Sequence, residues 1–292
     1  MTAAVADMIR VPLSFNHLIE VCASGDMDRR KRLASFMVKL SRQYSILPFL
    51  LVRQEEILES VLRRLGINAQ IFKRERLVQQ GLWCAFGVQP TFEGGHPNQT
   101  ALLEQVLHSD AMAIKMLSEW MSSEGGRSLR QQSEQEAMFL DKIRHAQLRD
   151  QGAEGKRRED TLAAAKLMLL PLADAECRKF GIAPAKLHAT FGSEDDLMGF
   201  AHDVPSFDVL LELILARDEE AQRQIHRNDL RDMGFLATAI PYCDVVVVER
   251  YFGFLAKRLG LDQKYGCTIL TNVAELPSFL PKPTPVPPTA AG

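Results

Sequence analysis

Four consecutive valines between Asp244 and Glu249 place the strongest constraint on the fold of this 292-residue chain. β-Branched residues favour strands, and an unbroken apolar run of this kind indicates a strand that is buried on both faces. Amphipathic helical patterns flank the run at residues 228–240 and 251–259, and a second apolar segment follows at 267–271. Because helices alternate with strands here, the sequence predicts a parallel sheet covered by helices, and therefore an α/β fold.

The rest of the chain is dominated by apolar residues at helical spacing. A short apolar segment at residues 9–13 predicts one further strand, and a polar, acidic stretch at 192–203 predicts a break between helices. Pro241 and Tyr242 are expected to end the helix that precedes the valine run. The protein is therefore expected to be helix-rich. The other predicted helices cover residues 15–23, 33–40, 55–65, 101–122, 128–151, 159–180 and 209–227.

The composition excludes several classes of protein. There are 35 Lys and Arg residues against 37 Asp and Glu residues, so the net charge of −2 rules out a polycation of the histone type. The net charge does not exclude a local basic groove, because it does not show how the charges are distributed over the surface. The five cysteines form no CxxC pair, which argues against a disulfide framework or a zinc finger. No apolar stretch approaches the ~18 residues of a membrane span, and we expect a soluble, cytoplasmic protein without a membrane partner.

Several carboxylates are expected to meet at one edge of the predicted sheet. In an α/β layer, the C-terminal ends of strands and the N-terminal ends of the flanking helices lie along the same edge, where ligands bind. Asp229 and Asp232 open one helix and share a face of it, and Glu249 ends the following strand. Glu20 lies in the second turn of the first helix. Asp244 begins the valine strand, and the rise of a strand places it about 16 Å from Glu249, toward the other edge.

A cluster of carboxylates repels itself unless a cation neutralises it. Mg²⁺ and Mn²⁺ prefer oxygen ligands of this kind, and such ions can activate a water for in-line attack on a phosphodiester. Simpler interpretations exist for single residues: Asp229 as a helix N-cap, Glu20 as a surface residue and Asp244 as a turn carboxylate. The predicted metal ligands are Glu20, Asp229, Asp232, Asp244 and Glu249, and all but Asp244 are also predicted to be catalytic.

The segment at residues 228–252, NDLRDMGFLATAIPYCDVVVVERYF, resembles the C-terminal signature of PIN-domain nucleases. In this family an acidic residue opens an Ala-rich helix, and the strand that follows ends at an acidic position. Asp232 matches the acid of the helix, and Glu249 matches the Asp of the family's Thr-x-Asp strand end. Val248 and Glu249 stand where Thr and Asp are usual, which is a departure from the family pattern.

The N-terminal segment VPLSFNHLIEV, residues 11–21, resembles the part of the family that carries a further acid, which would be Glu20. The final TILTNVAEL resembles the strand and helix that close the fold. PIN domains begin with a strand that carries an Asp, and the residues before Ile9 do not provide one. Two interpretations stay open: the chain begins after that strand, or it lacks one metal ligand.

The resemblance implies a PIN-like, Rossmann-type parallel sheet flanked by helices and interrupted by a long helical insertion. Its two parts would be residues 1–52 and 206–280, with the insertion at 53–205 between them. Residues 281–292 hold five of the 14 prolines and are expected to form a disordered tail.

By the same resemblance, the protein is expected to be a metal-dependent ribonuclease. It would act on RNA, serve as a toxin or defence effector and have an inhibitor protein as a further partner. The alternative is a degenerate, non-catalytic PIN-like module that binds RNA or protein. A third hypothesis is a helical interaction protein without a nucleic-acid role.

The sequence contains two segments rich in basic residues. Arg29 to Arg32 form a charged run at a helix start, where cations oppose the helix dipole, and a solvated face is the simpler interpretation. Arginines between Arg217 and Arg231 precede the acidic helix and could track a phosphate backbone or pair with neighbouring acids.

Overall fold

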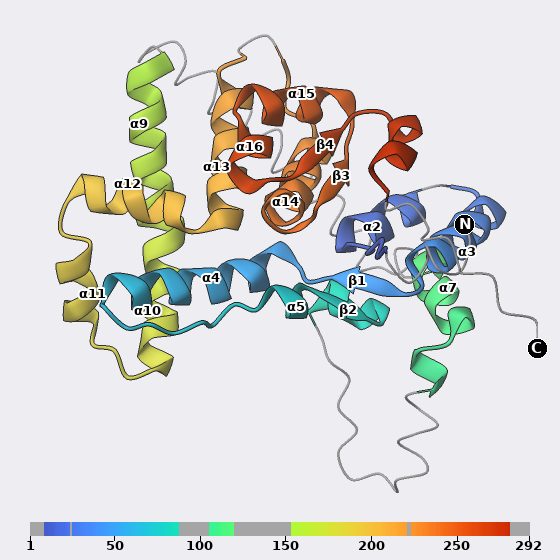
Figure 1. Ribbon diagram of the computed structural model, residues 1–292, viewed down its shortest axis with the longest axis horizontal. Helices are drawn as coiled ribbons and strands as arrows, with labels where there is room; N and C mark the ends of the chain where they lie inside the picture. The colour runs from blue at the N-terminus through green and yellow to red at the C-terminus, as the bar shows by residue number, and fades with distance from the viewer. Residues whose placement is uncertain (1–8, 24, 88–104, 120–152, 221–222, 281–292) are drawn as a thin grey trace, which may run out of the picture.

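The computed structural model describes residues 9–23, 25–87, 105–119, 153–220 and 223–280, and it is helix-rich, as predicted (Figure 1). The predicted helix at 128–151 and the predicted tail at 281–292 lie outside these residues. The first half of the chain contains α2 (Phe15–Ala23), α3 (Met27–Ser41), β1 (Tyr44–Ile46), α4 (Phe49–Arg64), α5 (Arg74–Leu77), β2 (Val78–Gln80), the 3₁₀ helix η1 (Leu82–Phe86) and α7 (Asp110–Glu119).

The second half begins with a long helical rod, because α9 (Ala153–Ala164) passes through a π-helical segment, η3 (Ala165–Leu169), directly into α10 (Leu170–Lys179). This rod confirms the helix predicted at 159–180. It is followed by α11 (Pro184–Thr190), α12 (Glu194–Asp203), α13 (Pro205–Asp218), α14 (Arg227–Tyr242), β3 (Val245–Val247), α15 (Arg250–Arg258), α16 (Leu261–Tyr265), β4 (Thr268–Leu270) and the 3₁₀ helix η4 (Val273–Phe279).

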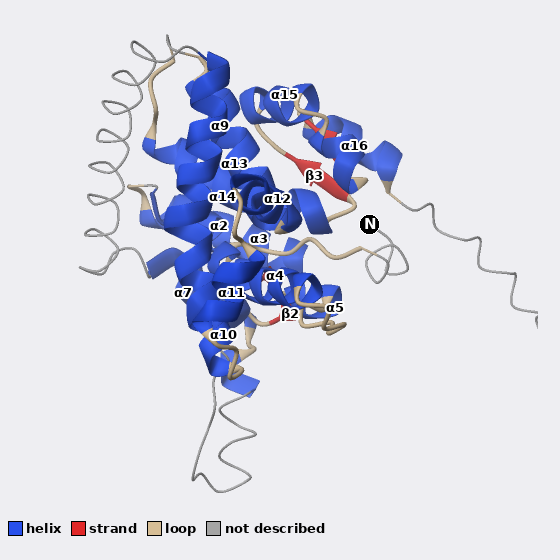
Figure 2. Cartoon of the chain, turned by 90° about the vertical axis from the view of Figure 1, so that its left-hand side faces the viewer, coloured by secondary structure: helices blue, strands red, loops and turns tan. Residues whose placement is uncertain are grey.

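The strands of the described residues form two small separate sheets, and Figure 2 shows them as short red segments among the helices. β3 and β4 pair in parallel, as predicted, with Val246 opposite Ile269. β1 and β2 pair antiparallel and were not predicted. The strand expected at residues 9–13 is reduced to one parallel bridge between Leu13 and Ser45.

The prediction that the valine strand is buried on both faces is wrong. Val246 is buried, whereas the side chain of Val247 is 38% exposed. Successive side chains of a strand point to opposite faces, so in a strand of three residues only the central one faces the core of α14 and α15.

The helix α13 lies between two apolar cores and is the centre of this part of the molecule (Figure 1). Leu211 and Leu215 pack with α4, α10 and α12, while Leu213 and Ala216 pack with α14, α15 and β4. A helix that is buried on two sides must be apolar around most of its circumference, which explains its continuous apolar sequence. A third core joins α2, α3 and α7.

Two predicted helix boundaries are corrected by the structure. The acidic stretch at 192–203 is the helix α12, because Ser193 and Asp196 form a capping box and the following acids favour a helix N-terminus. Pro241 does not end the helix before it, since α14 continues to Tyr242 and Cys243 still donates its backbone N–H to Ala239.

Candidate functional site

The N-terminal helix α2 is fastened to α14 by polar and aromatic contacts. The Asn16 side-chain amide donates a 2.6 Å hydrogen bond to the backbone carbonyl of Arg231. The ring of His17 packs edge-on against Phe235, with ring centroids 5.4 Å apart. Burial lowers the pKa of His17, which disfavours the charged form of the ring. Glu20 follows Asn16 by four residues and therefore lies on the side of α2 that faces α14.

Glu20, Asp232 and Glu249 form one electrostatic site, which we call the acidic trio. The pKa of Asp232 is raised to about 7, first by loss of hydration and then by the charges of Glu249, Glu20 and Asp229, while Arg231 opposes the shift. The pKa of Glu20 is raised by loss of hydration and by the charge of Glu249, again against Arg231. These carboxylates belong to α2, α14 and the N-cap of α15, and the charges of Glu20 and Glu249 both act on Asp232.

Asp229 lies beside the trio, but its carboxylate is engaged by the protein. Its Oδ2 accepts a 2.6 Å hydrogen bond from Arg223 and a 3.0 Å bond from the backbone N–H of His226. Its Oδ1 accepts a second bond from Arg223, at 2.9 Å. Burial alone would raise the pKa of Asp229, but these bonds outweigh it and leave the pKa lowered. Asp229 therefore fixes the start of α14 and the position of Arg223.

The guanidinium of Arg223 links this helix start to α15. Its Cζ lies 3.8 Å from the centre of the Tyr251 ring, and the Tyr251 hydroxyl donates a 3.1 Å hydrogen bond to Glu220. The pKa of Arg223 is raised mainly by its hydrogen bonds to Asp229, with a smaller contribution from the charge of Glu249. Arg223 is thus a fixed cation next to the acidic trio.

Asp244 is not brought together with the other predicted ligands. It precedes β3, whereas Glu249 follows this strand, and its side chain is 95% exposed. The carboxylate forms a 3.0 Å ion pair with Arg74 at the base of α5. The surroundings of Asp244 therefore match its simpler interpretation, a carboxylate in the turn between a helix and a strand.

The donor set of the acidic trio fits a hard divalent cation. All side-chain donors are carboxylate oxygens, which Mg²⁺ and Mn²⁺ prefer. After loss of hydration, the charges of Glu249 and Glu20 raise the pKa of Asp232 further, and Arg231 offsets this repulsion only in part. Such a site can bind a cation, and it can hold a proton on Asp232 near neutral pH.

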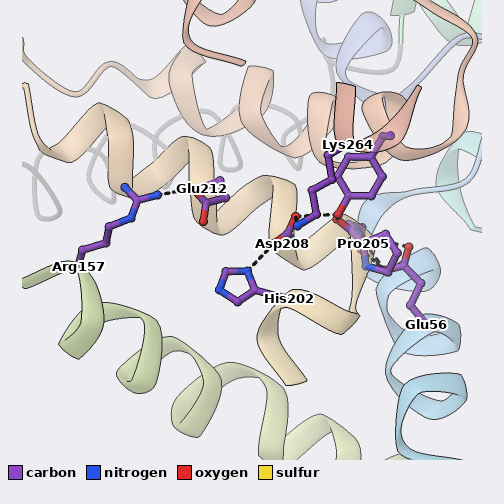
Figure 3. Close-up of polar contacts among 9 residues, drawn as sticks. Glu56, Arg157, His202, Pro205, Asp208, Glu212 and Lys264 are labelled. Atoms are coloured by element: carbon purple, nitrogen blue, oxygen red, sulfur yellow. Dashed lines mark hydrogen bonds and ion pairs between the residues drawn. The ribbon is translucent and has the colours of Figure 1, made fainter. Parts of the chain in front are cut away.

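A second polar cluster, which sequence analysis missed, lies where α12 meets α13 (Figure 3). Possible ligand atoms of His202, Asp208 and Glu212 lie within 4.8 Å of one another. Asp208 is fully buried and accepts hydrogen bonds from His202 Nδ1 at 2.6 Å, Lys264 Nζ at 2.8 Å and the Tyr265 hydroxyl at 2.7 Å. A carboxylate within the apolar run of α13 was the only available signal in the sequence.

This second cluster is already balanced by protein groups. Lys264 neutralises Asp208, and Arg157 pairs with Glu212. Burial would raise the pKa of Asp208, but the bonds from His202, Lys264 and Tyr265 leave it lowered. A metal ion would have to displace these donors, so the cluster is better described as a hydrogen-bonded junction between α12, α13 and α16.

A further buried carboxylate, Glu56, joins α4 to the same region. Its Oε2 accepts hydrogen bonds from the Ser206 backbone N–H at 3.0 Å and from the Ser206 hydroxyl, and its Oε1 accepts one from Tyr242. Burial raises the pKa of Glu56 to about 7, although these bonds oppose the shift. The side chain therefore changes its charge near neutral pH inside the protein.

None of the helices in the described residues is long and apolar enough to cross a bilayer. The four cysteines whose side chains the structure describes are free thiols. Neither a protein-family model nor a curated protein nor a solved structure matches this chain.

Proposed function

We propose that the protein is a divalent-metal-dependent ribonuclease with a PIN-like arrangement of its N- and C-terminal parts, and that the acidic trio is its active site. The observation that carries the proposal is the mutual repulsion of carboxylates from separate elements, which adds to the loss of hydration in raising the pKa of Asp232 to about 7. Mutual repulsion of this kind costs free energy in the folded protein. It is relieved when a cation binds, and the oxygen-only donor set suits Mg²⁺ or Mn²⁺.

Each described residue of the site has a distinct role in this proposal. Glu20, Asp232 and Glu249 would hold the ion, which supplies a water of lowered pKa for attack on the phosphodiester. Asp229 and Arg223 hold the start of α14 in place, and thereby Asp232, which lies one turn further along the helix. Arg231 already offsets the charge of Glu20 and Asp232 and would attract the phosphate.

The experiment that tests the proposal is cleavage of single-stranded RNA by the purified protein in Mn²⁺. We expect cleavage that is stopped by EDTA and abolished by Asp232→Asn. Asp244→Asn is the matched control, because this residue is an exposed acid at the other end of β3 and should leave the rate unchanged. Equal cleavage by the wild type and Asp232→Asn would refute the assignment of the site.

A non-catalytic binding module is the second candidate. It is favoured by the loss of one predicted ligand to Arg74 and the engagement of another by Arg223, which leaves the trio with fewer acids than expected. This candidate predicts binding of RNA without cleavage and no stabilisation of the protein by Mn²⁺ in a thermal melt.

A further inference from the structure

One surface of α3 carries exposed apolar and basic side chains together, and we call it the outer face of α3. The opposite side of the helix packs inward through Ala34, Val38 and Ser41. Residues three, four and seven apart share one side of a helix. On the outer face this spacing brings together Arg29, Arg32, Leu33, Phe36, Lys39 and Leu40, all of them exposed.

The apolar side chains of this face are exposed to solvent. The exposed fractions are 60% for Phe36, 43% for Leu40 and 39% for Leu33. Isolated exposed apolar residues are normal, but a contiguous group on one helix face indicates a binding surface. An aromatic ring at its centre offers a flat side for stacking.

The cations of the face are available for an anionic partner. Within the described residues, the side chains of Arg29, Arg32 and Lys39 form no ion pair. By contrast, Arg64 on α4 forms an ion pair with Asp203 at 2.5 Å. In addition, Arg29 and Arg32 lie in the first two turns of α3, where the helix dipole disfavours positive charge. An anionic ligand would relieve this cost.

The outer face begins close to the acidic trio along the chain. Glu20 is near the end of α2, and only the short connection from Ala23 to Met27 separates this helix from α3. Helical geometry and the greatest reach of that connection limit the distance between the Cα atoms of Glu20 and Arg29 to about 25 Å. A strand held at the trio could therefore extend over the face within a few nucleotides.

We propose that the outer face of α3 binds single-stranded RNA, with an unstacked base on Phe36 and phosphates on Arg29, Arg32 and Lys39. Cations alternating with an aromatic ring match the alternation of phosphates and bases along a single strand. A duplex keeps its bases stacked and presents no ring to Phe36. The identity of the ligand rests on the proposed nuclease function, whereas the binding itself is measured without cleavage.

The test is fluorescence anisotropy of a short, labelled single-stranded RNA with the purified protein in EDTA, so that cleavage does not enter. We expect Phe36→Ala to weaken binding by about 5- to 100-fold, the range for loss of one stacked base. The matched control is Phe180→Ala, because Phe180 is 58% exposed at the end of α10. The control should bind like the wild type, and melting temperatures verify that both variants fold.

The basic residues are tested by the salt dependence of binding. The double variant Arg29→Gln/Arg32→Gln should reduce the slope of log affinity against log salt by about 0.7 for each phosphate that the two arginines neutralise. The control pair, Arg63→Gln/Lys186→Gln, removes two exposed cations from other helices and should leave the slope unchanged.

The outcomes separate this inference from the proposed nuclease function. If Phe36→Ala loses binding and the wild type shows no cleavage, the result supports RNA binding by the outer face of α3 and refutes the proposed nuclease function. If the wild type cleaves RNA and both α3 variants bind RNA as the wild type does, the proposed role of the outer face of α3 is overturned, while the proposed nuclease function stands. Binding to phosphatidylserine vesicles or to duplex RNA that depends on Phe36 as strongly as single-stranded binding does would also overturn it.

Discussion

Asp229 and Arg223 are joined by two parallel hydrogen bonds, 2.6 and 2.9 Å long, at the beginning of α14. The side chains are 4% and 24% exposed, so water competes weakly for either partner. Because Arg223 also stacks on Tyr251, the pair connects the first turns of α14 and α15. These two helix starts carry Asp232 and Glu249, and the pair therefore determines how two members of the acidic trio face each other.

Removal of Asp229 should be strongly destabilising. Asp229→Ala leaves the Arg223 guanidinium without its carboxylate in a partly buried position, and we expect a loss of about 3 kcal/mol in the free energy of unfolding. Urea denaturation of Asp229→Ala, Arg223→Met and the double variant measures the coupling between the two residues, expected at about 1–3 kcal/mol.

The control cycle uses Asp174 and Arg178, which also form two hydrogen bonds but are 28% and 64% exposed. Exposed pairs of this spacing couple by only about 0.5 kcal/mol. Similar coupling energies in the two cycles would contradict the special role of the Asp229 pair.

Because the pKa of Asp232 is raised, replacing this residue with a neutral one should stabilise the protein by an amount that depends on the pH. The group has a folded pKa of about 7 against an ordinary value of 3.8, so the native state binds the proton more tightly. Stability is therefore lost as the pH rises between about 4 and 7. Asp232→Asn removes the ionisation, and its melting temperature should exceed that of the wild type by a few degrees at about pH 8 but not below about pH 4.

Mn²⁺ should raise the melting temperature of the wild type at about pH 8 and leave Asp232→Asn unchanged. If Asp232→Asn melts below the wild type at every pH, Asp232 stabilises the fold, and its charge does not reduce the free energy of unfolding.

Glu56 is expected to be a structural residue whose loss is costly. Glu56→Ala would leave the Ser206 N–H, its hydroxyl and the Tyr242 hydroxyl without their buried acceptor. Each unsatisfied group costs about 1–3 kcal/mol, so we expect at least about 3 kcal/mol in urea denaturation. The control Glu75→Ala changes an exposed acid on α5 and should be neutral within about 0.5 kcal/mol.

The pH dependence of stability distinguishes the effect of the charge of Glu56 from the effect of its shape. Its pKa is raised from 4.5 to about 7, so the wild type loses stability as the pH rises through this range. Glu56→Gln retains the shape and removes the charge, and its melting temperature should vary less across the same range. An unchanged pH profile in Glu56→Gln would mean that Glu56 does not titrate there.

His202 should stabilise the protein most at acidic pH. Its hydrogen bond to the buried Asp208 raises the pKa of the histidine. For a base with a raised pKa, the contribution is fully present below the unfolded value of 6.5 and is lost as the pH rises through the folded value. The melting temperature of His202→Gln should therefore fall further below that of the wild type at about pH 5.5 than at about pH 9.

His188→Gln is the control, because His188 is an exposed histidine on α11. A deficit of His202→Gln that is the same at both pH values would indicate loss of packing rather than loss of the charged hydrogen bond.

The helices were largely predictable because their signals are local. The bounds of α2 agree with the prediction, and α15 differs by one residue at each end, since apolar spacing along a helix is read from the residues themselves. The break predicted at 192–203 was wrong, because a run of acids is also typical of the first turn of a helix. The cap formed by Ser193 and Asp196 shows that the same acids favour a helix start.

The candidate site could be predicted only in part. Asp232 and Glu249 stand at a helix start and a strand end, and local pattern alone brings both toward one sheet edge. The engagement of Asp229 by Arg223 depends on the fold of the chain between α13 and α14. The pairing of Asp244 with Arg74 joins residues 170 positions apart, which no local pattern reveals.

Local patterns were enough to predict the helical character, the parallel pairing of the two C-terminal strands, and the acids at the start of α14 and after β3. These features depend on periodicity and on side chains within one or two turns. The contacts that bring Glu20 toward these acids were not predictable in this way, because Asn16 and His17 hold α2 against α14 across more than 200 positions of the chain. Only the tertiary structure decided that Asp208 and Glu56 are buried among donors, because burial depends on contacts between segments far apart in the chain.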